Sequence, residues 1–227
     1  MKNQNQFIAS LMATLVIATT TTLHAGGISG FSWYSGIASV ASTSIDPIVA
    51  PNNDDMVGAS PNIIFVTQKH YIGIGPVDLE FSVTNTGGTT EYLFKEGVFN
   101  DTGLNWGSYH IELGFGHGVG FVGSASGDGL DFDAPSYNSP FNFNGGSSFF
   151  PSVSVTEDDV LATGGVMPDL TFAGYFYFTV DVPDGISSFT VRQSPIPVGV
   201  PEPSSMVILT FGVAGLVMKR KHRKILC

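Results

Sequence analysis

The chain has 227 residues, of which 43% are hydrophobic and only 12% charged, with 19 acidic residues against nine Lys and Arg. Six of the basic residues lie at the two ends of the chain, and the part in between contains three basic and 19 acidic residues. Its formal charge is therefore −16, or −15 if Glu202 is removed with the C-terminal end. Such a surface repels phosphate backbones, which excludes a nucleic-acid partner.

The N-terminus has the layout of a secretory signal peptide. Lys2 precedes a short apolar run from Phe7 to Ala18, and a small residue, Ala25, ends the segment. The run is shorter than the roughly 20 residues that span a bilayer. We therefore predict a signal peptide over residues 1–25, cleavage after Ala25 and export by the Sec machinery. A buried N-terminal helix is the alternative.

Residues 26–197 carry an apolar pattern with a period of two, which predicts β-strands. In 77–84 Val77, Leu79, Phe81 and Val83 fall on one face, and in 171–182 Phe172, Phe176, Phe178, Val180 and Val182 do the same. Tyr109, Ile111 and Leu113 should point inward from a strand at 108–113. Further strands are predicted at 30–34, 63–68, 91–99, 119–123 and 152–156.

Glycine-rich turns separate these strands, and no window before the C-terminal end shows a helical period. Pro183-Asp184-Gly185 reads as a tight turn that would join 171–182 to the next strand as a C-terminal hairpin. Short strands with such turns predict an all-β extracellular domain at 26–197, an antiparallel β-sandwich of jelly-roll type.

One acidic loop has the character of a cation site. Asp128, Asp131 and Asp133 lie in a glycine-containing stretch, and calcium takes six to eight oxygen ligands. The spacing is not that of an EF-hand, and a solvated acidic loop is the plainer interpretation. The runs 53–55 and 157–159 are weaker versions of the same pattern.

Histidine and aromatic residues give two further candidates. His110 and Glu112 would share a strand face, with His117 in the following loop, a set that suits a transition metal or plain surface polarity. Trp33 and Tyr34 are candidates for stacking on sugars, whereas Trp106 is expected in the core.

The C-terminal segment, 198–227, contains three parts in a fixed order. Residues 200–203 read Val-Pro-Glu-Pro, residues 206–218 are mostly apolar, and a basic tail consists of Lys219, Arg220, Lys221, Arg223 and Lys224. As a transmembrane helix, 206–218 would be about 20 Å long, short for a hydrocarbon core of about 30 Å. The basic tail should stay cytoplasmic, which places the acidic domain outside.

This segment resembles the PEP-CTERM sorting signal of Gram-negative bacteria, in Val200, Pro201, Glu202 and Pro203, the apolar helix and the basic tail. The resemblance implies that a membrane-embedded exosortase recognises the Pro-Glu-Pro tripeptide and removes the tail. It also implies a final place at the cell surface or in the exopolysaccharide matrix. An ordinary retained membrane anchor is the alternative.

The middle of the chain, 83–116, also resembles a region that recurs in exported proteins with this tail, and that resemblance implies an extracellular β-domain. The same tail is catalogued in certain ice-binding proteins, but the only dense Thr run here, Thr19–Thr22, lies in the signal peptide.

We expect an exported, non-catalytic protein that associates with exopolysaccharide. The chain has no G-x-S-x-G elbow, phosphate loop or dinucleotide fingerprint. A calcium-dependent carbohydrate-binding or adhesin module is the first alternative. A secreted glycosidase, for which 19 carboxyl groups permit some pair, and an ice-binding protein are weaker ones.

Overall fold

Strands make up most of the chain that the computed structural model describes, namely residues 26–45, 62–85, 88–132, 142–143 and 149–199. Within these ranges there are thirteen β-strands, one short 3-10 turn at Gly118–Gly120 and no α-helix. The all-β prediction is confirmed. No helix in the described ranges has the length and apolarity needed to cross a membrane. The predicted signal peptide and the apolar segment 206–218 lie outside these residues.

The larger sheet has seven strands, of which six form a continuous path and β8 pairs with β7 alone. In spatial order they are β1 (Gly26–Tyr34), β5 (Val77–Asn85), β13 (Ser188–Pro197), β7 (Trp106–Phe115), β11 (Asp159–Thr163) and β10 (Ser152–Val155), with β8 at Val122–Gly123. Every neighbouring pair in it is antiparallel.

The second sheet has six strands. In spatial order they are β2 (Ala38–Val40), β4 (Ile63–Tyr71), β6 (Thr90–Asn100), β12 (Thr171–Val182) and β9 (Asn142–Phe143), and β3 (Thr43–Ile45) also pairs with β4. Its pairs are antiparallel except β4 with β6, which run parallel. Alternation within one strand does not reveal the direction of its neighbour, so this parallel pair could not be predicted from the sequence.

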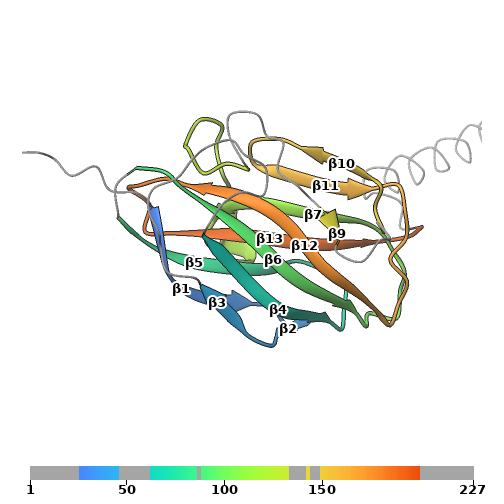
Figure 1. Cartoon of the computed structure of the whole chain (residues 1–227). Helices are drawn as coiled ribbons and strands as arrows, with labels where there is room; N and C mark the ends of the chain where they lie inside the picture. The colour runs from blue at the N-terminus through green and yellow to red at the C-terminus, as the bar shows by residue number, and fades with distance from the viewer. Residues whose placement is uncertain (1–25, 46–61, 86–87, 133–141, 144–148, 200–227) are drawn as a thin grey trace, which may run out of the picture.

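The two sheets share one apolar core (Figure 1). Phe81 of β5 meets Phe94 of β6 at 5.3 Å between ring centroids, and Tyr109 of β7 meets Phe176 of β12 at 4.8 Å. The predicted inward residues of β5 and β7 are all buried. Burial of these faces supplies the main driving force for folding, because apolar area leaves water on both sides of the core.

The strand pairs β5–β13, β6–β12 and β7–β11 are nested along the chain. Successive members of this series lie in alternate sheets. The chain from Val77 to Pro197 therefore pairs with itself like one long hairpin that is wrapped around the core.

Three expectations need correction. Pro183-Asp184-Gly185 does turn the chain, but β12 and β13 lie in different sheets and form no hairpin. The segment 119–123 is a 3-10 turn followed by the two-residue β8 rather than a full strand. Phe172 is 48% exposed, because an irregularity between Ala173 and Tyr175 changes the register and turns Ala173 inward instead.

Candidate functional site

The loop after β8 holds Asp128 in a tight turn. Ser124 Oγ and the Ala125 N–H donate hydrogen bonds to Asp128 Oδ2 at 2.8 and 3.0 Å, and the Leu130 N–H donates to Oδ1 at 2.9 Å. Gly127 supplies a backbone φ of 81°, which residues with a Cβ rarely adopt. Asp128 itself is exposed, so one end of the loop faces solvent.

Asp131 lies deeper in the same loop. Its neighbours Leu130 and Phe132 are fully buried, and its backbone exchanges hydrogen bonds with Asp181 of β12 at 2.8 and 3.3 Å. These contacts hold the loop against the core and leave Asp131 only 8% exposed. The carboxylate is thus fixed at the boundary between core and loop.

The turn between β10 and β11 brings two more acidic residues to this loop. The backbone carbonyl of Glu157 accepts from the Phe132 N–H at 2.8 Å, and that of Asp158 accepts from the Leu113 N–H at 2.9 Å. Carboxylate oxygens of Asp128, Asp131 and Asp158 all lie within 4.8 Å of one another. The turn therefore closes an acidic cluster, defined here as Asp128, Asp131, Glu157 and Asp158.

The acidic cluster concentrates negative charge that its own hydrogen bonds do not neutralise. Asp131 Oδ1 and Asp158 Oδ1 are buried and have no hydrogen-bond partner among the residues that the structure describes. Burial raises the pKa of Asp131 to about 7, with the charge of Glu157 adding to the shift, and burial also raises the pKa of Asp158. Hydrogen bonds from Ser126 and Gly127 lower the pKa of Glu157. A cation would stabilise all these carboxylates together.

The donor set consists of carboxylate oxygens, which is the chemistry of calcium rather than of softer metals. Of the residues predicted for this site, Asp128 and Asp131 are brought together, and Asp133 lies outside the described residues. Asp158 takes part although it stands far from the loop in sequence. The only signal for Asp158 in the sequence was that it belongs to the acidic run 157–159. Calcium binding itself stays a prediction.

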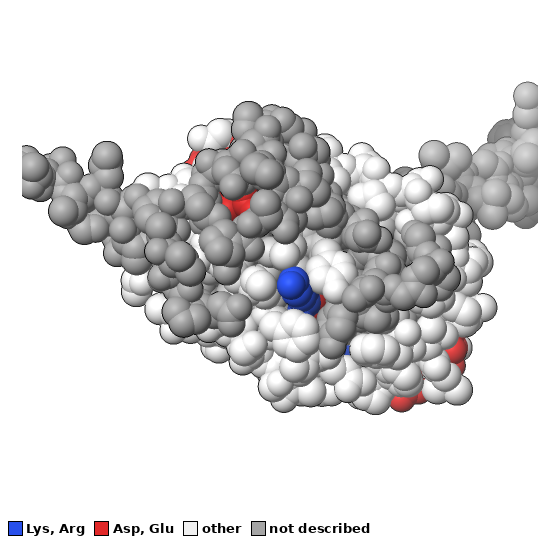
Figure 2. Space-filling model, viewed as in Figure 1, with Lys and Arg blue, Asp and Glu red and all other residues white. Residues whose placement is uncertain are grey.

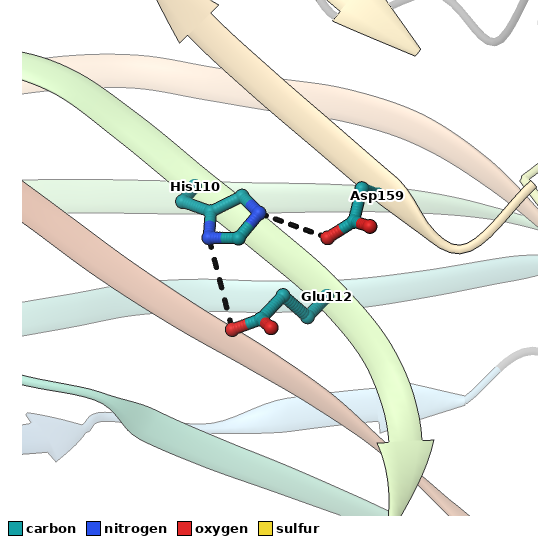
Figure 3. A group of neighbouring side chains, drawn as sticks. All are labelled: His110, Glu112 and Asp159. Atoms are coloured by element: carbon teal, nitrogen blue, oxygen red, sulfur yellow. Dashed lines mark hydrogen bonds and ion pairs between the residues drawn. The ribbon is translucent and has the colours of Figure 1, made fainter. Parts of the chain in front are cut away.

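His110 belongs to a second cluster on the neighbouring strands (Figure 3). Its Nε2 lies 2.9 Å from Asp159 Oδ1 of β11, and its Nδ1 lies 3.7 Å from Glu112 Oε2 of β7. Both ring nitrogens thus face carboxylates. With three donors including an imidazole, the group also has the composition of a transition-metal site.

His117 does not join His110, contrary to the sequence-based grouping. Its ring stacks on Tyr34 with 3.6 Å between centroids and an interplanar angle of 2°, and its Nδ1 lies 3.6 Å from Glu80 Oε2. Trp33 and Tyr34 are 37% and 39% exposed at the end of β1, as a sugar-stacking role needs. Trp106 is fully buried, so its placement in the core is confirmed.

A third polar group lies between the sheets, and no role was predicted for it from the sequence. Lys69, Glu96, Tyr109 and Gln193 are all 0% exposed, and Lys69 Nζ donates a hydrogen bond to Glu96 Oε2 at 2.5 Å. Lysine is among the residues least often fully buried. Its position in the irregular part of β4 gave no period-two signal from which burial could be predicted.

The predicted sorting residues lie outside the described residues. These are Val200, Pro201, Glu202, Pro203, Lys219, Arg220, Lys221, Arg223 and Lys224, together with the predicted cleavage residue Ala25. Their assignment therefore depends on the sequence and on its comparison with known families.

That comparison identifies the tail. Residues 199–223 match the family described as the PEP-CTERM protein-sorting motif. The suspected PEP-CTERM signal is thus confirmed, over the C-terminal part of the chain. No curated protein matches the chain, and no solved structure matches its fold.

Proposed function

From this sorting motif, which marks an exported protein that is transiently anchored at the membrane and processed by an exosortase, we propose a more specific role. The chain is a bacterial surface or exopolysaccharide-matrix protein that acts by association rather than by catalysis. The match at residues 199–223 is the observation that carries this proposal.

The proposed organisation follows the sequence. A signal peptide, 1–25, directs Sec export, the domain 26–197 folds outside, and the segment 198–227 delivers it to the exosortase. The basic tail stays cytoplasmic, as the positive-inside rule requires. We assign the domain to the jelly-roll type of β-sandwich. The nested pairs β5–β13, β6–β12 and β7–β11 in alternating sheets support this assignment.

Association with matrix would use two features of the surface. On the face drawn in Figure 2, most of the described surface is uncharged, with small acidic patches near the top and at the lower right and a basic side chain near the centre. Divalent cations can bridge such carboxylates to acidic polysaccharide. The exposed rings of Trp33 and Tyr34 offer flat apolar surfaces for sugar rings, and His117 holds the Tyr34 ring in place by stacking.

Substitutions in the tripeptide test the sorting role. In the host, the double variant Glu202→Ala/Pro203→Ala should accumulate in the inner membrane with residues 219–227 still attached, because the exosortase no longer recognises it. Ser205→Ala, two residues beyond the tripeptide, is the matched control and should be processed normally. Normal processing and release of the double variant would contradict the proposal.

A calcium-dependent carbohydrate-binding or adhesin module is the second candidate function. The buried, unpartnered Asp131 Oδ1 within the acidic cluster favours it, since an unpaired buried carboxylate is costly without a cation. Retention on exopolysaccharide that calcium restores after chelation would support this function. Retention that is equal with and without a chelator would leave association through the aromatic surface alone.

A further inference from the structure

The buried polar group between the sheets has the components of a covalent cross-link. Lys69 comes from β4 and Glu96 from β6 of one sheet, and Gln193 comes from β13 of the other. Lys69 Nζ contacts both the Glu96 carboxylate and the Gln193 side-chain oxygen. The amide carbon of Gln193 is one C=O bond from that oxygen, so the amine lies close to the carbon that it would attack.

The other contacts of the Gln193 amide match what an acyl transfer requires. The Tyr109 hydroxyl donates to Gln193 Oε1 at 2.7 Å, where negative charge would develop. The Gln193 NH₂ group donates to Glu96 Oε1 and Oε2 at 3.0 and 2.8 Å. Glu96 therefore touches both the attacking nitrogen of Lys69 and the nitrogen that would leave.

We propose that Lys69 and Gln193 join in an intramolecular isopeptide bond, with Glu96 carrying the proton and Tyr109 stabilising the oxyanion. The reaction is an amide exchange. It releases one ammonia and needs neither an oxidant nor a cofactor.

The surroundings favour the reactive form of the amine. Burial lowers the pKa of Lys69, because an ammonium is poorly stabilised away from water. A neutral lysine is the nucleophilic form. Burial also raises the pKa of Tyr109, so its hydroxyl keeps the proton that it donates to Gln193.

The bonds and protons balance as follows. Lys69 first passes a proton to Glu96 across their hydrogen bond, and the freed Nζ lone pair forms a bond to Gln193 Cδ while the C=O π electrons move to Oε1. Glu96 gives its proton to Nε2 and takes one from Nζ. The carbonyl re-forms, the Cδ–Nε2 bond breaks, and ammonia leaves. Glu96 ends protonated, as it was at the moment of attack.

Local irregularities in the sheet bring these groups together. The β4–β6 register shifts between Val66 and Lys69, and the β6–β12 register shifts between Ala173 and Tyr175, next to the pair Phe176–Glu96. Such bulges re-aim side chains and are frequent beside reactive sites. Here both flank Glu96, the residue that the mechanism uses as its proton carrier.

The bond would also meet a structural need of an exported domain. It would tie β4 of one sheet to β13 of the other across 124 residues of sequence. The chain has a single Cys and forms no internal disulfide. A cross-link between the two sheets would oppose their separation under pulling or proteolysis.

Mass spectrometry of the full chain recovered after export tests the proposal directly. We expect peptide mapping to show Lys69 and Gln193 in one branched species, about 17 Da lighter than the sum of its linear parts because ammonia is lost. Trypsin should fail to cleave after Lys69. Recovery of both residues in linear peptides of full mass would overturn the proposal and leave a buried ion pair.

Variants test the roles assigned to Glu96 and Gln193. Whether the Lys69–Gln193 bond forms at all is tested on the unsubstituted chain. Glu96→Gln should remain linear, because it has no carboxylate to move the proton. Gln193→Glu should give the same cross-link with loss of water instead of ammonia. Lys95→Arg, on the same strand β6, is the matched control and should keep the Lys69–Gln193 bond. Cross-linking of Glu96→Gln at the normal yield would overturn the role of Glu96.

Discussion

Asp131 combines burial with an oxygen that has no partner among the described residues, so we expect it to determine whether the acidic cluster binds calcium. A ligand that binds only the folded state raises its stability. At calcium about 100-fold above the dissociation constant, the melting temperature should rise by about 5–10 °C. In Asp131→Asn the shift should fall below about 2 °C. The calcium-free variant should be at least as stable as the unsubstituted chain, since one buried charge is gone.

Differential scanning fluorimetry with and without a chelator checks this prediction. Asp101→Asn serves as the control, because Asp101 is a partly exposed carboxylate that pairs with His70 outside the acidic cluster. It should keep the full calcium shift. An unchanged calcium shift in Asp131→Asn would show that calcium binds elsewhere.

At the scale of residues, the sequence indicated which kinds of side chain form a site better than it indicated which residues lie close together in the fold. Asp128 and Asp131 could be chosen because they lie close together in a glycine-containing loop. Asp158 could not be joined to them, because it arrives from another turn through long-range backbone hydrogen bonds. Lys69 and Gln193 are 124 residues apart, and nothing in their flanking residues indicates that they meet.

At the scale of elements, Gly97 allows β6 to approach β4. A Cβ at this position would lie 2.4 Å from the Thr67 carbonyl oxygen in the irregular part of β4. Gly97→Ala should therefore lower the free energy of unfolding by about 2 kcal/mol, since backbone must move to relieve the clash. Urea denaturation measures the change.

Gly36→Ala is the matched control, because a Cβ there meets no atom within 4 Å. It should change the free energy of unfolding by less than about 0.5 kcal/mol. Equal effects of the two substitutions would contradict the close approach of β4 and β6.

Arg192 of β13 joins the larger sheet to the loop that follows β7. It holds Asp78 of β5 through two hydrogen bonds at 2.7 and 2.9 Å, and it also donates to the Gly118 carbonyl at 2.7 Å. Asp78 is only 2% exposed. Arg192→Met should cost about 3 kcal/mol, because it leaves a buried carboxylate unpaired.

The double variant Arg192→Met/Asp78→Leu should recover part of that loss, since no charge stays buried. Chemical denaturation of the unsubstituted chain, of the single variants Arg192→Met and Asp78→Leu and of the double variant completes a cycle. If the loss in the free energy of unfolding of the double variant equals the sum of the losses of the two single variants, the pair is not coupled and the prediction fails.

Strand positions followed from the sequence, but strand partners did not. Val77–Asn85 and Thr171–Val182 appear nearly as the alternation predicted, because one face of each strand must leave water. The hairpin at Pro183-Asp184-Gly185 was wrong, since a turn fixes a reversal of direction and not the sheet that the next strand joins. The short strand Asp159–Thr163 was missed, because its apolar pattern is too brief to stand out.

At the scale of the whole molecule, the tail and the domain carry separate information. The tail indicates how the protein is exported and sorted, through the motif matched at residues 199–223. The domain offers an acidic composition, the exposed rings of Trp33 and Tyr34, and one core shared between two sheets. We propose that the two belong to one exported protein that loses both ends before it acts.

Intact-mass analysis of the protein from the host's cell envelope and medium tests this claim most directly. We expect a mature form that starts near Gly26 and ends close to Pro203, found outside the inner membrane. A mass that still includes residues 219–227 in every fraction would contradict it, because the tail would then be a permanent anchor and not a sorting signal.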